Sequence, residues 1–184
     1  MLRMGESRIV IGVAGRIGSG KSFAAHHLEQ HFGFQYLRYS LVLADWFKAD
    51  PAAKSYLQEV GWGVMSSDRQ RELNRRLIAL VDRKNDRAVD GLRHPIDYDS
   101  LKNEFAFQFA LIYIDTPPEI RFGRLRDRYQ TYDEFLAADS HPVESNIDSL
   151  VPLASVVLSG VPPVEKLGVE IDKFVAMFRS REGM

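Results

Sequence analysis

The 184-residue chain contains no cysteine. Disulfides, thiolate zinc sites, iron–sulfur clusters and cysteine nucleophiles are therefore excluded. Neither sign of charge is in excess, because 24 basic and 25 acidic side chains leave a formal net charge of -1. Nothing in this balance indicates a nucleic-acid or membrane surface that binds through bulk charge. Long apolar runs are also missing, so no segment is long enough to span a bilayer.

The N-terminal residues MLRMGESR lack the apolar centre and cleavage site of a signal peptide. Apolar residues make up 45% of the chain, which is typical of one globular domain with a sizeable core. We therefore expect a single domain over residues 1–184, in a soluble cytoplasmic protein that binds neither nucleic acid nor membranes. The sequence leaves the oligomeric state open.

Apolar runs of strand length alternate with segments of helical periodicity along the chain. The expected strands are residues 8–14, 34–40, 87–91, 107–115 and 153–160. The expected helices are residues 22–32, 41–50, 51–62, 69–84, 96–105, 119–129 and 163–179. This alternation indicates an α/β fold with a parallel sheet and right-handed crossovers. Ligands of such sheets bind at the carboxyl ends of the strands.

The sequence GRIGSGKS at residues 15–22 follows the first expected strand and matches G-x-x-x-x-G-K-[ST] at every position. Its glycines allow backbone conformations that a β-carbon disfavours, so consecutive N–H groups can turn inward as an anion-binding nest. Lys21 supplies a mobile cation for the outer phosphates, and the Ser22 hydroxyl is suited to ligate Mg²⁺. A glycine-rich connector is the alternative, but the flanking strand and helix favour a nucleoside triphosphate site. The residues assigned to the donor nucleotide are Gly15, Gly18, Ser19, Gly20, Lys21 and Ser22.

A second polar group ends the expected strand at residues 87–91. Asp90 is placed to hold the hydration shell of Mg²⁺ beside Ser22, and Arg93 offers a planar fork for a phosphate. The alternative is a surface turn with a solvated arginine, but a triphosphate requires a metal-holding acid. Arg38 and Ser40, at the end of the second strand, are expected to face the same site and bind the acceptor.

Four arginines lie between residues 121 and 128. On the expected helix, Arg121, Arg124 and Arg128 share one face. Cations on one face repel one another unless an anion lies between them, and a transferring phosphoryl group is such an anion. We predict catalytic roles for Lys21, Arg124 and Arg128, and leave Arg121 open between this role and a solvated charged face. Arg126 is expected to be solvated.

Two further segments have competing interpretations. Residues 129–145 are polar and form either a lid that closes over bound phosphates or a surface helix and loop. Asp139, His141 and Glu144 in this segment are candidate substrate contacts, although their spacing does not require it. His27 and His31 have the i, i+4 spacing of a metal pair. No carboxylate of the right pattern lies nearby in the sequence, so a structural or surface role is favoured.

Together these segments resemble the nucleoside-monophosphate-kinase group of P-loop proteins. GRIGSGKS is similar to the loop of dephospho-coenzyme A kinases. AVDGLRHPIDYDSLK, LIYIDTPPEIRFGRLRDR and YDEFLAAD are more similar to archaeal adenylate-kinase-like proteins and to the kinase-like domain fused to some deoxycytidylate deaminases. The resemblance implies a three-layer α/β P-loop NTPase fold, a parallel sheet of strand order 2-3-1-4-5, and ATP with Mg²⁺ as the donor. It also implies an acceptor-binding helical region at residues 40–80 and a lid after Arg128.

The resemblance extends to individual residues. Gly15, Gly18, Gly20, Lys21 and Ser22 match the donor motif, Asp90 and Arg93 match a DGxR segment, and Arg124 and Arg128 match lid-entry arginines. The Asp-x-Asp segment expected in dephospho-coenzyme A kinases is replaced by Tyr39-Ser40-Leu41. We therefore expect an ATP-dependent kinase acting on a small nucleotide or nucleotide-like acceptor. The alternatives are a dephospho-coenzyme A kinase and a nucleotide-binding regulatory ATPase without phosphoryl transfer.

Overall fold

The computed structural model describes residues 8–82, 84–161 and 163–182. Its sheet has five parallel strands in the order β2-β3-β1-β4-β5, which confirms the expected α/β fold and strand order. The strands are β1 (Val10–Ala14), β2 (Gln35–Arg38), β3 (Arg87–Leu92), β4 (Phe109–Asp115) and β5 (Val156–Ser159). Residues 1–7, on which the absence of a signal peptide was argued, lie outside the described residues, as does Arg83 in the expected helix 69–84.

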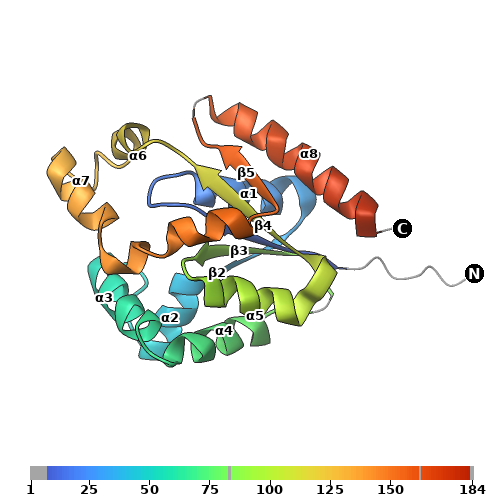
Figure 1. Ribbon diagram of the computed structural model, residues 1–184, viewed down its shortest axis with the longest axis horizontal. Coiled ribbons are helices and arrows are strands. Elements are labelled where there is room, and N and C mark those ends of the chain that lie inside the picture. The colour runs from blue at the N-terminus through green and yellow to red at the C-terminus, as the bar shows by residue number, and fades with distance from the viewer. Residues whose placement is uncertain (1–7, 83, 162, 183–184) are drawn as a thin grey trace, which may run out of the picture.

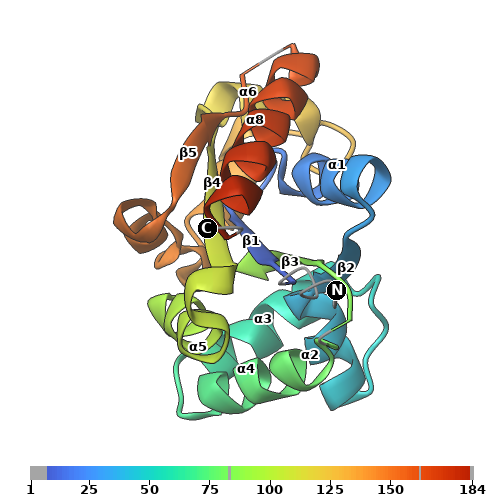
Figure 2. The ribbon, with the colours of Figure 1, turned by 90° about the vertical axis from the view of Figure 1, so that its right-hand side faces the viewer.

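Helices cover both faces of the sheet (Figures 1 and 2). The α-helices are α1 (Lys21–Phe32), α2 (Tyr39–Phe47), α3 (Lys54–Met65), α4 (Arg69–Ala79), α5 (Pro95–Phe105), α6 (Pro118–Arg124), α7 (Tyr132–Asp139) and α8 (Val164–Glu182). Three 3₁₀ helices are η1 (Ala106–Gln108), η2 (Pro142–Glu144) and η3 (Ile147–Leu153). Among the described residues, no helix combines the length and the apolarity needed to cross a membrane.

The central strand β1 is buried along its whole length because it packs against helices on both faces. Ile11 and Val13 belong to the core shared with α1 and α8. Val10 and Ala14 belong to the core shared with α2, α4 and α5. This two-sided burial explains why the strand is a continuous apolar run rather than an alternating one.

The expected helices 69–84 and 119–129 each end five residues earlier in the structure than the sequence pattern predicts. α4 ends at Ala79 rather than at residue 84, because the Asp82 carboxylate accepts hydrogen bonds from the backbone N–H groups of Lys84 and Asn85. Such a side-chain turn competes with helical hydrogen bonds. α6 ends at Arg124, after which i→i+3 turns lead to Arg128.

The segment 129–145 is mostly helical and lies beyond the carboxyl ends of the strands (Figure 1). Thr131 and Glu134 form a reciprocal capping box at the N-terminus of α7. Phe135 on this helix is fully buried, and η2 packs against α3. The segment therefore has its own folded structure next to the site, and its closure as a lid stays a prediction.

Candidate active site

The phosphate-binding loop, residues 15–22, has the backbone conformation that its glycines permit. Gly15, Gly18 and Gly20 all have positive φ angles, of 144°, 76° and 115°. A β-carbon at Gly15 would lie 2.5 Å from the carbonyl oxygen of Ile114 and 2.6 Å from Ser19 Oγ. Any larger residue at this position would therefore force the loop away from β4. The loop leads directly into α1, whose N-terminal N–H groups favour an anion.

Lys21 is the first residue of α1 and its side chain turns back over the loop. Its Nζ donates to the carbonyl oxygens of Gly15, at 2.6 Å, and Arg16, at 2.8 Å. Burial lowers the pKa of Lys21 to about 8, although the negative charges of Asp90 and Glu144 oppose that shift. A buried ammonium group that is partly compensated favours an anion close by.

Asp90 lies near the end of β3, next to β1, and its carboxylate is only partly satisfied. One oxygen, Oδ2, accepts a hydrogen bond from the Tyr36 hydroxyl at 2.7 Å and lies 3.8 Å from Arg38 Nε. The other oxygen, Oδ1, is buried without a hydrogen-bond partner among the residues that the structure describes. Burying such an oxygen costs free energy unless a ligand satisfies it. Ser22 lines the same pocket, so this pair fits a hydrated Mg²⁺ through oxygen donors.

Arg93 forms an ion pair with Glu144 across the site. Its Nη2 lies 3.1 Å from Oε1 of Glu144, a side chain that is 1% exposed. Within the described part of the chain, Arg93 Nε and the second Glu144 oxygen are buried without a partner. The buried Asp97 accepts hydrogen bonds at 3.0 Å from the backbone N–H groups of Arg93 and His94, which fixes the position of this turn.

These groups meet in one pocket of about 400 Å³. Its polar lining includes the predicted residues Gly18, Gly20, Lys21, Ser22, Arg38, Ser40, Asp90, Arg93 and Arg128. Leu43, Leu57 and Leu73, from α2, α3 and α4, form part of an apolar wall. Residues 40–80 thus contribute a large part of the pocket, as the resemblance implied.

Excess positive charge surrounds this pocket. Lys54, at the start of α3, has a lowered pKa, first because of burial and then because of the nearby cations Arg38 and Arg128. These three cations lie near one another in a single pocket, which therefore favours an anionic ligand.

Arg124 lies against the phosphate-binding loop and is not among the residues that line the pocket. Its Nη1 donates to the carbonyl oxygens of Gly18, at 3.2 Å, and Ser19, at 3.0 Å, and its Nη2 donates to Gly160. It therefore ties the loop to the segment after β5. Its predicted contact with a transferring phosphoryl group stays a prediction.

The expectation that Arg121, Arg124 and Arg128 share one helix face is wrong, because α6 ends at Arg124. Arg121 is 3% exposed, and its guanidinium makes two hydrogen bonds to the Asp139 carboxylate, at 2.6 and 2.9 Å. The same group donates to the carbonyl oxygen of Ile17 at 3.1 Å. Arg121 therefore joins α6, α7 and the loop, and its anion is Asp139 rather than a phosphoryl group.

The pocket is also lined by Lys54, Gln70 and Asp97, to which the sequence interpretation gave no role in the site. Lys54 carries no local signal, because it is one lysine at the start of a helix. Gln70 and Asn74 can be recognised in the sequence, because they continue the buried stripe of Leu73 and Leu77 at helical spacing. Asn74 donates to Asp97 at 2.8 Å, so this polar cluster joins α4 to α5 beneath the pocket. Polar residues on an otherwise apolar stripe indicate such a cluster.

No family model matches the chain. UPF0200 protein PH1008 from Pyrococcus horikoshii is 28% identical over 107 residues. That match covers 55% of this chain and 58% of the relative, so the chain spans little more than half the length of the curated protein that it matches.

Solved structures match over nearly the whole chain at low sequence identity. A gluconokinase from Sinorhizobium meliloti has a TM-score of 0.63 at 14% identity and covers 96% of this chain and 95% of its own. Shikimate kinase from Acinetobacter baumannii in complex with shikimate has a TM-score of 0.57 at 15% identity, and the match covers 94% of this chain and 95% of that chain. TT1252 from Thermus thermophilus has a TM-score of 0.57 at 18% identity, and the match covers 93% of this chain and 98% of that chain. The chain therefore has the three-layer α/β fold of the P-loop kinases.

Proposed function

We propose that the protein is an ATP-dependent small-molecule kinase that transfers the γ-phosphoryl group to a nucleotide or nucleotide-like acceptor. The observation that carries the proposal is a single pocket with the phosphate-binding loop on one wall and Arg93 on another. Donor phosphates and an anionic acceptor would thus share a site from which bulk water is partly excluded. Close positioning of this kind is most of what phosphoryl transfer requires.

The donor half consists of the loop, Lys21, Ser22 and Asp90. Loop N–H groups and Lys21 bind the β- and γ-phosphates, while Ser22 and the unpartnered Asp90 oxygen hold Mg²⁺ through its water shell. When bound, Mg²⁺ neutralises phosphate charge. ATP is proposed rather than GTP because the sequence has no Asn/Thr-Lys-x-Asp segment that reads guanine.

The acceptor half consists of Arg93, Arg38, Ser40 and the apolar side chains of α2 to α4. Arg93 is held by Glu144 and presents its guanidinium to the pocket. An acceptor oxygen placed there forms a new P–O bond as the bond between the γ-phosphorus and the oxygen of ADP breaks. Leucines on the apolar wall suit a base or another flat ring, which favours a nucleotide-like acceptor over a small polar one.

The test is an assay of ADP release with Mg·ATP and a panel of acceptors. The panel contains nucleoside monophosphates and dephospho-coenzyme A, together with gluconate and shikimate, because two structural neighbours are named as kinases of those compounds. We expect ADP release that depends on one nucleotide-like acceptor and is abolished by Lys21→Ala.

Each alternative predicts a different result. ADP release that depends on dephospho-coenzyme A alone would identify the protein as a dephospho-coenzyme A kinase. Tight ATP binding without transfer to any acceptor would overturn the kinase proposal in favour of a regulatory ATPase. If calorimetry detects no binding of any Mg-nucleotide, both interpretations fail.

A further inference from the structure

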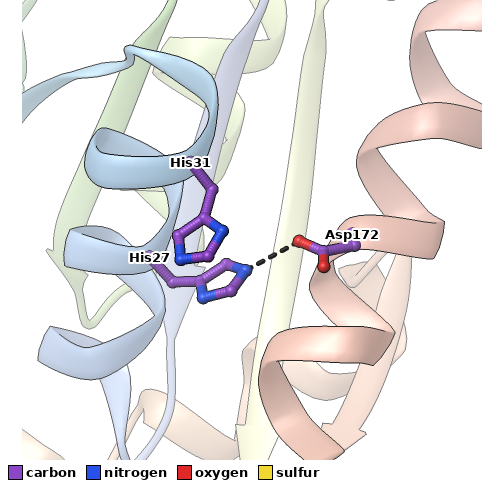
Figure 3. Close-up of side chains that lie close together, drawn as sticks. All are labelled: His27, His31 and Asp172. Atoms are coloured by element: carbon purple, nitrogen blue, oxygen red, sulfur yellow. Dashed lines mark hydrogen bonds and ion pairs between the residues drawn. The ribbon is translucent and has the colours of Figure 1, made fainter. Parts of the chain in front are cut away.

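Three potential metal ligands converge between the first and last helices of the described chain (Figure 3). His27 and His31 lie one turn apart on α1, and Asp172 lies on α8. One ligand atom from each residue lies within 4.8 Å of the other two. Across residues 8–82, 84–161 and 163–182, this is the only such group of three histidine or acidic side chains.

Two of the three potential ligand atoms lie near the spacing of a zinc site. His27 Nε2 and Asp172 Oδ1 are 2.7 Å apart. Zinc binds imidazole nitrogen and carboxylate oxygen at about 2.0–2.2 Å in a tetrahedral arrangement, so its ligand atoms lie a little over 3 Å apart. The contact between His27 and Asp172 would have to widen slightly, and the exposed His31 ring would have to turn out of its stack on His27 so that its nitrogen faces the ion.

The position of the His27 ring is constrained by its surroundings. The ring is 10% exposed and stacks on His31 with ring centroids 4.0 Å apart. A β-carbon at Gly168 of α8 would lie 2.9 Å from its Cε1 atom. Glycine within a helix is less stabilising than alanine. At position 168, the absence of a side chain leaves the space that the His27 ring occupies.

An ordinary ion pair between α1 and α8 accounts for His27 and Asp172 but not for His31. A metal ion can use both imidazoles as nitrogen ligands. The aspartate is the carboxylate that the local sequence lacks, because it is contributed by a helix more than a hundred residues away.

We propose that His27, His31 and Asp172 bind one Zn²⁺ ion that links α1 to α8. Three protein ligands leave a fourth position for water. Imidazole nitrogens favour zinc over Mg²⁺, which takes oxygen ligands, so this site differs in chemistry from the one at Ser22 and Asp90. The ion would join the C-terminal helix to the helix that begins at Lys21.

The test is a zinc titration of chelator-treated, tag-free protein in the absence of nucleotide, read by competition with a coloured zinc indicator. We expect one zinc ion per chain. His31→Ala and Asp172→Asn should each weaken binding about tenfold or more, as the loss of a direct ligand should weaken a metal site at least as much as the loss of an outer-shell partner does. His26→Ala is the matched control, because His26 is an exposed neighbour on α1 and should leave the affinity unchanged.

A second readout identifies the ligands. Co²⁺ in place of Zn²⁺ should give the intense visible absorption of a four-coordinate nitrogen–oxygen site, and His31→Ala should remove it. Millimolar Mg²⁺ should not displace the zinc. The proposal is overturned if zinc does not bind, or if it binds equally well to folded His31→Ala protein. Neither result bears on phosphoryl transfer, which is measured separately.

Discussion

The fold changes the chemistry of Lys21, because burial lowers its pKa to about 8. The unfolded chain would hold this proton up to a higher pH. Between about 8 and the ordinary value of 10.5, the unfolded state therefore binds more protons, and this one group makes stability rise with pH. Phosphate binding favours the ammonium form and so opposes this lowering of the Lys21 pKa.

We therefore predict that Mg·ATP affinity falls by up to about tenfold for each pH unit above about 8, because the free protein must then take up a proton to bind. Isothermal calorimetry in buffers of different ionisation enthalpy measures both the affinity and the proton uptake. Lys21→Arg is the control, since its guanidinium stays charged and its affinity should be flat over this range. A wild-type affinity that is equally flat would contradict the lowered pKa.

Variants of the Arg93–Glu144 ion pair can separate the contribution of Arg93 to stability from its contribution to acceptor binding. Arg93→Ala leaves the Glu144 carboxylate buried and unpaired, so we expect a loss of about 1–3 kcal/mol in the free energy of unfolding and a raised acceptor KM. Adding Glu144→Gln should restore part of the stability but none of the acceptor affinity. Urea unfolding and steady-state kinetics measure the two effects. An unchanged acceptor KM in folded Arg93→Ala protein would remove this residue from the acceptor site.

The individual residues differ in how far the sequence identifies them. The loop residues Gly15 to Ser22 form a contiguous motif, so local order is enough to recognise them. Asp90 and Arg93 could be placed because they end a strand of a parallel sheet. Lys54 could not, because its position in the pocket depends on how α3 packs.

At the scale of elements, the shortness of α6 changes where the arginines after the fourth strand lie and what they contact. Sequence spacing places three of them on one face only if the helix continues to residue 129. In the structure, Arg121 lies inside the protein with Asp139, and Arg128 follows the helix end. A helical pattern in the sequence does not show where the helix ends. It also does not show that one of its arginines pairs with an acid on another helix.

We predict that Arg121→Ala lowers the free energy of unfolding by about 1–3 kcal/mol, because the buried Asp139 carboxylate loses two hydrogen bonds and keeps only the longer ion pair with Arg16, at 3.5 Å. Arg126→Ala, in the same segment, should change it by less than about 0.5 kcal/mol, since that side chain is exposed. Denaturant unfolding of the two variants measures the difference. Equal stabilities would mean that α7 is not held through Arg121.

At the scale of the whole molecule, the pocket brings together segments that lie far apart in the sequence. Its walls come from the phosphate-binding loop, from α2 to α4, and from η2. A ligand that contacts all of them stabilises the native state only, and so raises the unfolding temperature by an amount that grows with its concentration relative to its Kd.

At a concentration of Mg·ATP about one hundred times its Kd, we predict about 2.7 kcal/mol of added stability, which corresponds to several degrees in Tm for a chain of this size. Differential scanning calorimetry with and without nucleotide measures the shift. Lys21→Ala should show little or no shift. A shift of equal size in that variant would mean that the nucleotide binds elsewhere.

The alternation of strands and helices, together with one glycine-rich motif, was enough to predict the α/β class and the phosphate-binding loop. These features are local, because periodicity and turn chemistry depend on neighbouring residues. The strand order came from the family resemblance, and the structure confirms it.

Contacts between distant segments were set by packing. Glu144 meets Arg93, Asp139 meets Arg121, and Asp172 meets His27 across 51, 18 and 145 positions of the chain, as the differences of their residue numbers give. Each pair forms because burying one charged or polar group requires a partner, and the chain supplies that partner from whichever element the core brings close. Sequence order holds no record of those distances, which is why the pocket and the histidine cluster became visible only in three dimensions.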